Sequence, residues 1–204
     1  MKLLHIDSSI TGGGSVTRQI TASIVAHLKR ETSALEISYR DLAADPVPHQ
    51  SLALLSAKAP SVGEHSSEVQ HALAATEAAL DEFLSADVVV IGAPMYNFGI
   101  SSQLKTWIDA LAVAGRTYSY TEMGPEGLCG AKRLIIASSR GGVYSAPSPM
   151  ASLDHQEAYL SGFFAFIGIT DVEFVRAEGI AMGPEQKETA VNGALAQAGG
   201  LRAA

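Results

Sequence analysis

The sequence lacks most features that would place the protein outside the ordinary globular classes. Cys129 is its one cysteine, so no intrachain disulfide can form, and this usage is typical of a reducing compartment. Charged residues make up 17% of the chain, the net charge is −7, and no lysine- or arginine-rich cluster occurs. These values disfavour a nucleic-acid-binding surface. The apolar content of 47% excludes a disordered chain.

Long hydrophobic runs are missing as well. The apolar run at residues 3–6 is ended by Asp7 and Ser8, far short of a signal-peptide core. No stretch approaches the roughly 20 apolar residues that a membrane span needs. We therefore expect a cytoplasmic protein without a membrane segment. The length of 204 residues is expected to fold as a single domain, residues 1–204.

Several motifs of known chemistry are absent. No GxGxxG stands in the register that a dinucleotide fold requires, and no GxxxxGK[ST] or GxSxG occurs. A phosphoacceptor receiver domain needs an aspartate at the end of the third strand, where this chain has residues 91–94, IGAP. The histidines are scattered, without the i, i+4 pairing that metal sites commonly use, so no metal is expected.

What is present is an alternation of short apolar runs with helical patterns. Strands are expected over residues 3–6, 35–39, 88–91, 132–137 and 171–175, and helices over 20–30, 69–84, 104–113, 159–167 and 185–198. Residues 116–127 suggest an exposed hairpin or flap, Gly115 is expected to terminate the preceding helix, and residues 52–63 give mixed signals. The alternation predicts a three-layer α/β sandwich with a five-stranded parallel sheet, in the flavodoxin-like order 2-1-3-4-5.

This strand order brings three loops together at the carboxyl edge of the sheet. The loop over 9–17 offers hydroxyls and helix N–H groups to an anion, without the lysine that usually accompanies a triphosphate. The loop over 94–99 is apolar and aromatic, and the glycines within 139–144 allow close backbone approach. Together the three loops offer donors to a phosphate, apolar walls to a flat ring and polar groups to the edge of that ring. These are the parts of flavin mononucleotide (FMN), whose hydride chemistry requires no side-chain acid or base.

Four motifs make a family resemblance specific. They are PMYNF at 94–98, YTE with GPEG at 120–127, SRGG at 139–142 and FIGITDV at 166–172. With these motifs the chain resembles the FMN-dependent NADH-azoreductases along nearly its whole length. The resemblance implies a homodimer with the flavin at the subunit interface. It also implies that NADH, or in some members NADPH, reduces quinones and azo compounds by a two-electron, ping-pong route.

The resemblance further implies roles for individual residues. The chemistry would take place at FMN N5, with no catalytic side chain. Tyr120 and Phe163 resemble positions that shape the substrate pocket. The implied cofactor-binding residues are Ser9, Ser15, Val16, Thr17, Met95, Tyr96, Asn97, Phe98, Ser139, Arg140, Gly141 and Gly142.

One alternative shares the fold and the cofactor, namely a flavodoxin-type carrier of single electrons. Such a carrier should show acidic clusters around the exposed flavin edge, and the three loops contain none. The sequence leaves open the physiological substrate and the choice between NADH and NADPH. It also leaves open whether Arg140 is structural or orients the phosphate.

Overall fold

The structure is a computed structural model that describes residues 1–57 and 65–203. The strands are β1 (Lys2–Asp7), β2 (Glu36–Asp41), β3 (Val88–Pro94), β4 (Tyr118–Thr121), β5 (Gly124–Gly127), β6 (Arg133–Arg140) and β7 (Val172–Glu178). The α-helices are α1 (Val16–Glu31), α2 (Leu52–Ala57), α3 (Ser67–Ser85), α4 (Ser102–Leu111), α5 (His155–Phe166) and α6 (Pro184–Gly199), and short 3₁₀ turns cover Gly12–Gly14 and Ala151–Leu153.

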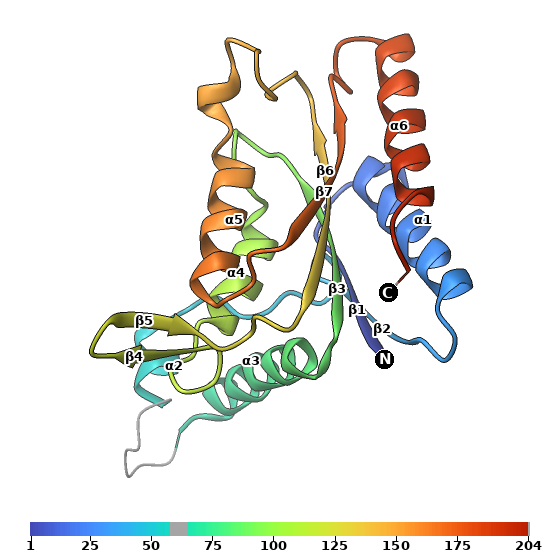
Figure 1. Cartoon of the computed structure of the whole chain (residues 1–204). Coiled ribbons are helices and arrows are strands. Elements are labelled where there is room, and N and C mark those ends of the chain that lie inside the picture. Colours follow the sequence, from blue (N-terminus) through green and yellow to red (C-terminus); the bar gives the residue numbers. More distant parts are fainter. Residues whose placement is uncertain (58–64, 204) are drawn as a thin grey trace.

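Five strands form one parallel sheet in the order β2-β1-β3-β6-β7 (Figure 1). Counted along the chain, this is the predicted order 2-1-3-4-5. The central strand β3 is buried along its entire length, as its unbroken apolar run predicts for a strand covered on both faces. The flavodoxin-like three-layer fold is thereby confirmed.

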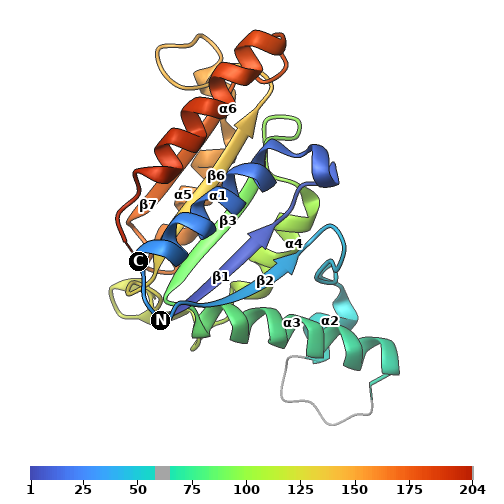
Figure 2. The same ribbon diagram turned by 90° about the vertical axis from the view of Figure 1, so that its right-hand side faces the viewer.

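Helices cover both faces of the sheet. α1 and α6 pack on one face, and α3, α4 and α5 pack on the other (Figures 1 and 2). Trp107 on α4 is fully buried and meets the Phe83 ring of α3 edge-on at 5.9 Å, so it belongs to the core. Cys129 is buried, as expected of a small apolar side chain.

The loops that follow β1, β3 and β6 gather at the carboxyl edge of the sheet (Figure 2). The Met95 N–H donates a hydrogen bond of 2.9 Å to the Ser139 carbonyl, so the loop after β3 is held against the end of β6. This edge is where open α/β sheets bind ligands.

The β4–β5 hairpin confirms the expected hairpin, but it lies at the opposite, amino edge of the sheet (Figures 1 and 2). The reason is topological: α4 runs back from the carboxyl edge, and the hairpin occupies the connection before β6 starts. Tyr118 and Tyr120 therefore cannot cover a ligand bound to the loops of their own chain.

Several expected boundaries are wrong, among them the start of the helix expected over 159–167, which begins at His155. β6 continues through Ser139 and Arg140, which the sequence had suggested as loop, because both residues pair with β7. α4 ends at Leu111, so Gly115, with a φ of 78°, belongs to the following turn rather than to the helix end. Residues 124–127 form the second strand of the expected hairpin. Of the unassigned segment 52–63, residues 52–57 form α2 and the remainder lies outside the described residues.

Within residues 1–57 and 65–203, none of the helices combines the length and the apolar character that crossing a bilayer requires.

Candidate functional site

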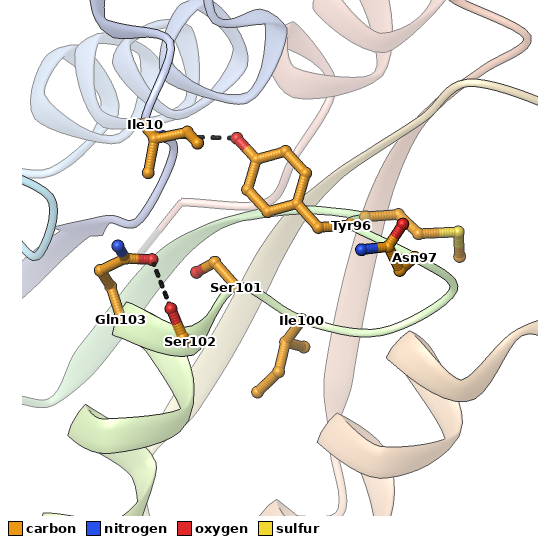
Figure 3. A pocket seen from close by; sticks show the side chains of 8 residues that line it. Ile10, Tyr96, Asn97, Ile100, Ser101, Ser102 and Gln103 are labelled. Atoms are coloured by element: carbon orange, nitrogen blue, oxygen red, sulfur yellow. Dashed lines mark hydrogen bonds between the residues drawn. The ribbon is translucent and has the colours of Figure 1, made fainter. Parts of the chain in front are cut away.

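Two adjoining pockets open at the carboxyl edge of the sheet. The larger has a volume of about 570 Å³ and lies between Ile10, the 95–97 loop and the start of α4. The smaller has a volume of about 210 Å³ and lies between the 9–16 loop, the β3 and β6 ends and α6. Met95 and Tyr96 line both pockets, so the two adjoin there, and together they are called the cleft below. In Figure 3 the Tyr96 hydroxyl points to Ile10, while Ser102 and Gln103 line the opposite side.

The start of α1 supplies hydrogen-bond donors to the smaller pocket. Ser15 caps the helix, because its Oγ accepts from the Arg18 N–H at 3.3 Å and its carbonyl accepts from the Gln19 N–H. The N–H groups of Val16 and Thr17 then remain at the positive end of the helix dipole. Since Ser15 and Val16 line the pocket, an anion placed there meets backbone donors directly.

The 95–99 loop holds an unusual backbone conformation. Tyr96 and Gly99 exchange two backbone hydrogen bonds of 2.9 and 3.0 Å, which closes a two-residue turn. Asn97 and Phe98 occupy its centre with φ values of 48° and 70°. Residues other than glycine seldom adopt this left-handed backbone conformation. Such strain is typical of ligand-binding loops, where the surrounding structure enforces it.

Arg140 lies at the end of β6 with its side chain fully buried. Its guanidinium forms ion pairs with Asp154, Glu157 and Glu178, and its Nε donates to Ser138 Oγ at 3.1 Å. Of the two predicted roles for this side chain, the structure favours the structural one, since its charge is engaged by carboxylates. The predicted role of Arg140 in cofactor binding can therefore concern only its backbone N–H and carbonyl groups.

Glu178 connects this charged cluster to the loop after β6. Its Oε1 accepts from the N–H groups of Tyr144 and Ser145 at 2.7 and 3.0 Å and pairs with Arg140 at 3.1 Å. Burial alone would raise the pKa of Glu178, but these hydrogen bonds and the Arg140 charge outweigh it and lower the pKa. The carboxylate thus stays ionised and fixes the loop beside the cleft.

A second charged network supports the loop after β1. Arg18 binds both oxygens of Asp41 at 2.7 Å and donates to the Ser9 carbonyl at 2.8 Å. The bond to Arg18 lowers the pKa of Asp41. Asp7 is buried below this loop; burial would raise its pKa, but His5, Thr21 and Arg18 together lower it. No local sequence pattern indicates this network, because its members come from three elements that are separated along the chain.

Acidification is expected to destabilise the fold through these carboxylates. A carboxylate whose pKa is lowered by folding contributes stability above its unfolded pKa and loses it as the pH falls through the folded value. The free energy of unfolding should therefore decrease as the pH falls from the ordinary carboxyl pKa of about 4 toward the lower pKa values that Asp7, Asp41 and Glu178 have in the folded protein. Asp7→Asn should show a smaller decrease than the wild type in urea unfolding measured across this range. An identical decrease in both proteins would contradict this assignment.

The cleft brings together most of the predicted cofactor-binding residues. Those that line it are Ser9, Ser15, Val16, Met95, Tyr96, Asn97, Ser139 and Gly141. The other four are not among the lining residues: Thr17 is fully buried with its hydroxyl on Ser15, Phe98 contacts the Tyr144 ring, Arg140 is buried, and the Gly142 carbonyl accepts from the Gly179 N–H. Ile10, Ile180 and Lys187 also line the cleft and were not predicted.

The two predicted substrate-pocket residues do not reach the cleft of their own chain. Tyr120 lies on the hairpin at the amino edge, 75% exposed and edge-on to Tyr118. Phe163 lies on α5, packed against the core and the Phe164 ring. Neither residue is among those that line the cleft of its own chain, so their role in a substrate pocket stays a prediction.

The residues of the cleft fit FMN. The smaller pocket offers the α1 donors to one phosphate, Met95 and Tyr96 offer walls to a flat ring, and Ser139 and Gly141 offer polar backbone close by. An alanine at Gly141 would bring its Cβ to 3.4 Å from the Ala181 Cβ, so this backbone is closely packed on its far side. Among the described residues, no group of three or more His, Cys, Asp or Glu side chains is arranged to hold a metal ion.

Comparison with known proteins agrees with this geometry. A family model described as the flavodoxin-like fold matches residues 1–201. The FMN-dependent NADH:quinone oxidoreductase of Methylocella silvestris is 56% identical over 191 residues, 94% of each chain, and that of Bradyrhizobium sp. is 53% identical over the full length of both. The crystal structure of an FMN-dependent NADH-azoreductase from Bacillus anthracis in complex with FMN is similar, with a TM-score of 0.86 and 28% identity over 97% of this chain and 98% of that one.

Proposed function

The chain belongs to the family of the flavodoxin-like fold, and we propose that it is an FMN-dependent NADH:quinone oxidoreductase that also reduces azo compounds. The observation that carries the proposal is the cleft at the carboxyl edge, in which an anion cradle, an apolar wall and a polar backbone edge adjoin. Relatives above 50% identity along the whole chain bear the name of this activity. The flavodoxin-type carrier is not favoured, because no carboxylate from the described residues lines either pocket.

When bound, FMN would supply the two-electron redox chemistry between NADH and the acceptor. The chain binds and orients it. The N–H groups of Val16 and Thr17, with Ser9 and Ser15, hold the phosphate, and Met95 to Phe98 line the ring. The backbone from Ser139 to Gly142 provides donors to the polar ring edge, where negative charge develops on reduction.

We propose that the working enzyme is a cytoplasmic homodimer and that residues 1–204 act as one FMN-binding domain. Two observations support the dimer. Tyr120 and Phe163, which the resemblance assigns to the substrate pocket, do not line the cleft of their own chain, so this assignment requires a second copy. Leu52, Leu55, Met123 and Phe166 leave large apolar surfaces exposed. The cytoplasmic location is supported by the single cysteine.

Steady-state turnover tests the function. With NADH and a benzoquinone as substrates, we expect FMN-dependent oxidation of NADH and parallel double-reciprocal lines, because both substrates use one site in turn. An azo dye should replace the quinone as acceptor. A protein that retains FMN but oxidises no NADH with either acceptor would contradict the proposal and favour the carrier.

A further inference from the structure

One lysine lies at the phosphate end of the cleft. Lys187 lines the smaller pocket together with Ser9, Ser15 and Val16. It belongs to the first turn of α6, which packs against α1 and begins beyond the α1 start at this edge of the sheet (Figures 1 and 2). The side chain is exposed, and within the described part of the chain it forms no ion pair or side-chain hydrogen bond. Its ammonium group is therefore available to a ligand.

The other cations near the cleft are already engaged. Arg18 is held by Asp41 and the Ser9 carbonyl, and Arg140 is held by its three carboxylates. No aspartate or glutamate of the described chain is among the residues that line the two pockets. The pocket thus contains one uncompensated positive charge and no negative one.

The position of Lys187 is fixed by the loop after β6. The N–H groups of Gly179, Ile180 and Ala181 donate to the carbonyls of Gly142, Arg140 and Gly141 at 2.9 to 3.1 Å. Gly183, with a φ of 124°, then turns the chain into α6, where Pro184 occupies the first turn. The segment that carries Lys187 is therefore hydrogen-bonded to the same loop that borders the cleft.

We propose that Lys187 is a binding residue for the FMN phosphate and pairs its ammonium group with that dianion. This inference rests on the proposed function. Helix N–H groups satisfy the phosphate oxygens as acceptors, but a phosphomonoester carries about −1.5 to −2 charges near pH 7, and the chain itself has a net charge of −7. Lys187 supplies a unit positive charge, which the α1 loop does not contain. It thereby makes the site prefer FMN to riboflavin, which has the same ring and no phosphate.

Flavin fluorescence titration of the FMN-free protein tests the proposal. For Lys187→Gln we expect the Kd for FMN to rise roughly tenfold, as for the loss of a charge-assisted hydrogen bond, and the Kd for riboflavin to stay unchanged. Lys187→Arg should restore most of the FMN affinity, because it keeps the charge. Lys29→Gln is the matched control, since Lys29 is also exposed but lies in the last turn of α1. It should leave both constants at the wild-type values.

A second readout is the ³¹P resonance of bound FMN, which should shift in Lys187→Gln and not in Lys29→Gln. The proposal is overturned if Lys187→Gln binds FMN within twofold of the wild type. It is also overturned if FMN and riboflavin affinities fall equally, because Lys187 would then shape the cleft without recognising phosphate. Wild-type protein that binds no FMN would instead contradict the proposed function.

Discussion

Replacing Arg140 with methionine is expected to lower the free energy of unfolding by about 3–5 kcal/mol and to weaken FMN binding at the same time. The guanidinium is fully buried among Asp154, Glu157 and Glu178, whose side chains are themselves mostly covered. Methionine fills a similar volume but leaves the carboxylates without their central positive charge. Stabilities of whole domains are about 5–15 kcal/mol, so this loss is a large share.

The effect on FMN should arise through Glu178. This carboxylate holds the N–H groups of Tyr144 and Ser145, and its own position depends on Arg140. We therefore expect the loop after β6 to loosen in Arg140→Met. Urea unfolding measures the first effect and flavin titration the second.

Arg202→Met provides the control for Arg140. Arg202 also pairs with a carboxylate, Asp171, but its side chain is 61% exposed, and exposed pairs contribute about 0–1 kcal/mol. The double variant Arg140→Met with Glu178→Gln should recover part of the lost stability, because one unpaired charge is removed. If Arg140→Met unfolds within about 1 kcal/mol of the wild type, the buried cluster does not have the role assigned here.

Alanine at Gly127 is expected to cost more than about 3 kcal/mol, or to prevent folding, although it adds a single methyl group. Gly127 ends β5 where the hairpin crosses the turn between α5 and β7, and an added Cβ would overlap the backbone of Ile167 and Gly168. The adjacent hydrogen bond from the Cys129 N–H to the Ile167 carbonyl, 2.8 Å, keeps the two segments together. Backbone atoms cannot move aside as the end of a flexible side chain can. The hairpin and the turn between α5 and β7 must therefore separate to accommodate the methyl group.

Gly162→Ala is the comparison for Gly127. Gly162 lies inside α5, and apart from its chain neighbours and the adjacent backbone of its own helix, no atom of the described residues lies within 4 Å of the position that its Cβ would take. Alanine is favoured over glycine within a helix by about 1 kcal/mol, so this variant should be as stable as the wild type or more stable. Thermal unfolding of the two variants separates the predictions. A Gly127→Ala protein with wild-type stability would show that the hairpin does not cross the α5–β7 turn as described.

The sequence predicted the fold because its signals are local. Each strand of the main sheet is a short apolar run, and each of the loops after β1, β3 and β6 follows one directly. Known rules for parallel sheets then bring these loops to one edge. The contact between Met95 and Ser139 is a direct consequence of that order.

Other parts of the site depend on contacts that no local pattern encodes. The sequence predicts that Arg140 is a loop residue, because two glycines follow it. The carboxylates that pair with its guanidinium come from the start of α5 and from β7. Lys187 follows an ordinary helix start and reaches the cleft only because α6 packs against α1. The location of Tyr120 depends on which edge of the sheet the hairpin occupies. The sequence of a hairpin alternates in the same way at either edge, so the pattern cannot predict this location.

The most direct test of the account is an anaerobic absorbance titration of the protein after FMN loading and gel filtration. We expect flavin to be retained in the protein fraction, to lose its visible absorbance completely when NADH is added, and to regain it when a quinone is added. This sequence of changes requires both a binding cleft and access of nicotinamide and quinone to the bound flavin. Retained flavin that NADH cannot bleach would contradict the reductase function, and a protein fraction without flavin would contradict the cofactor site itself.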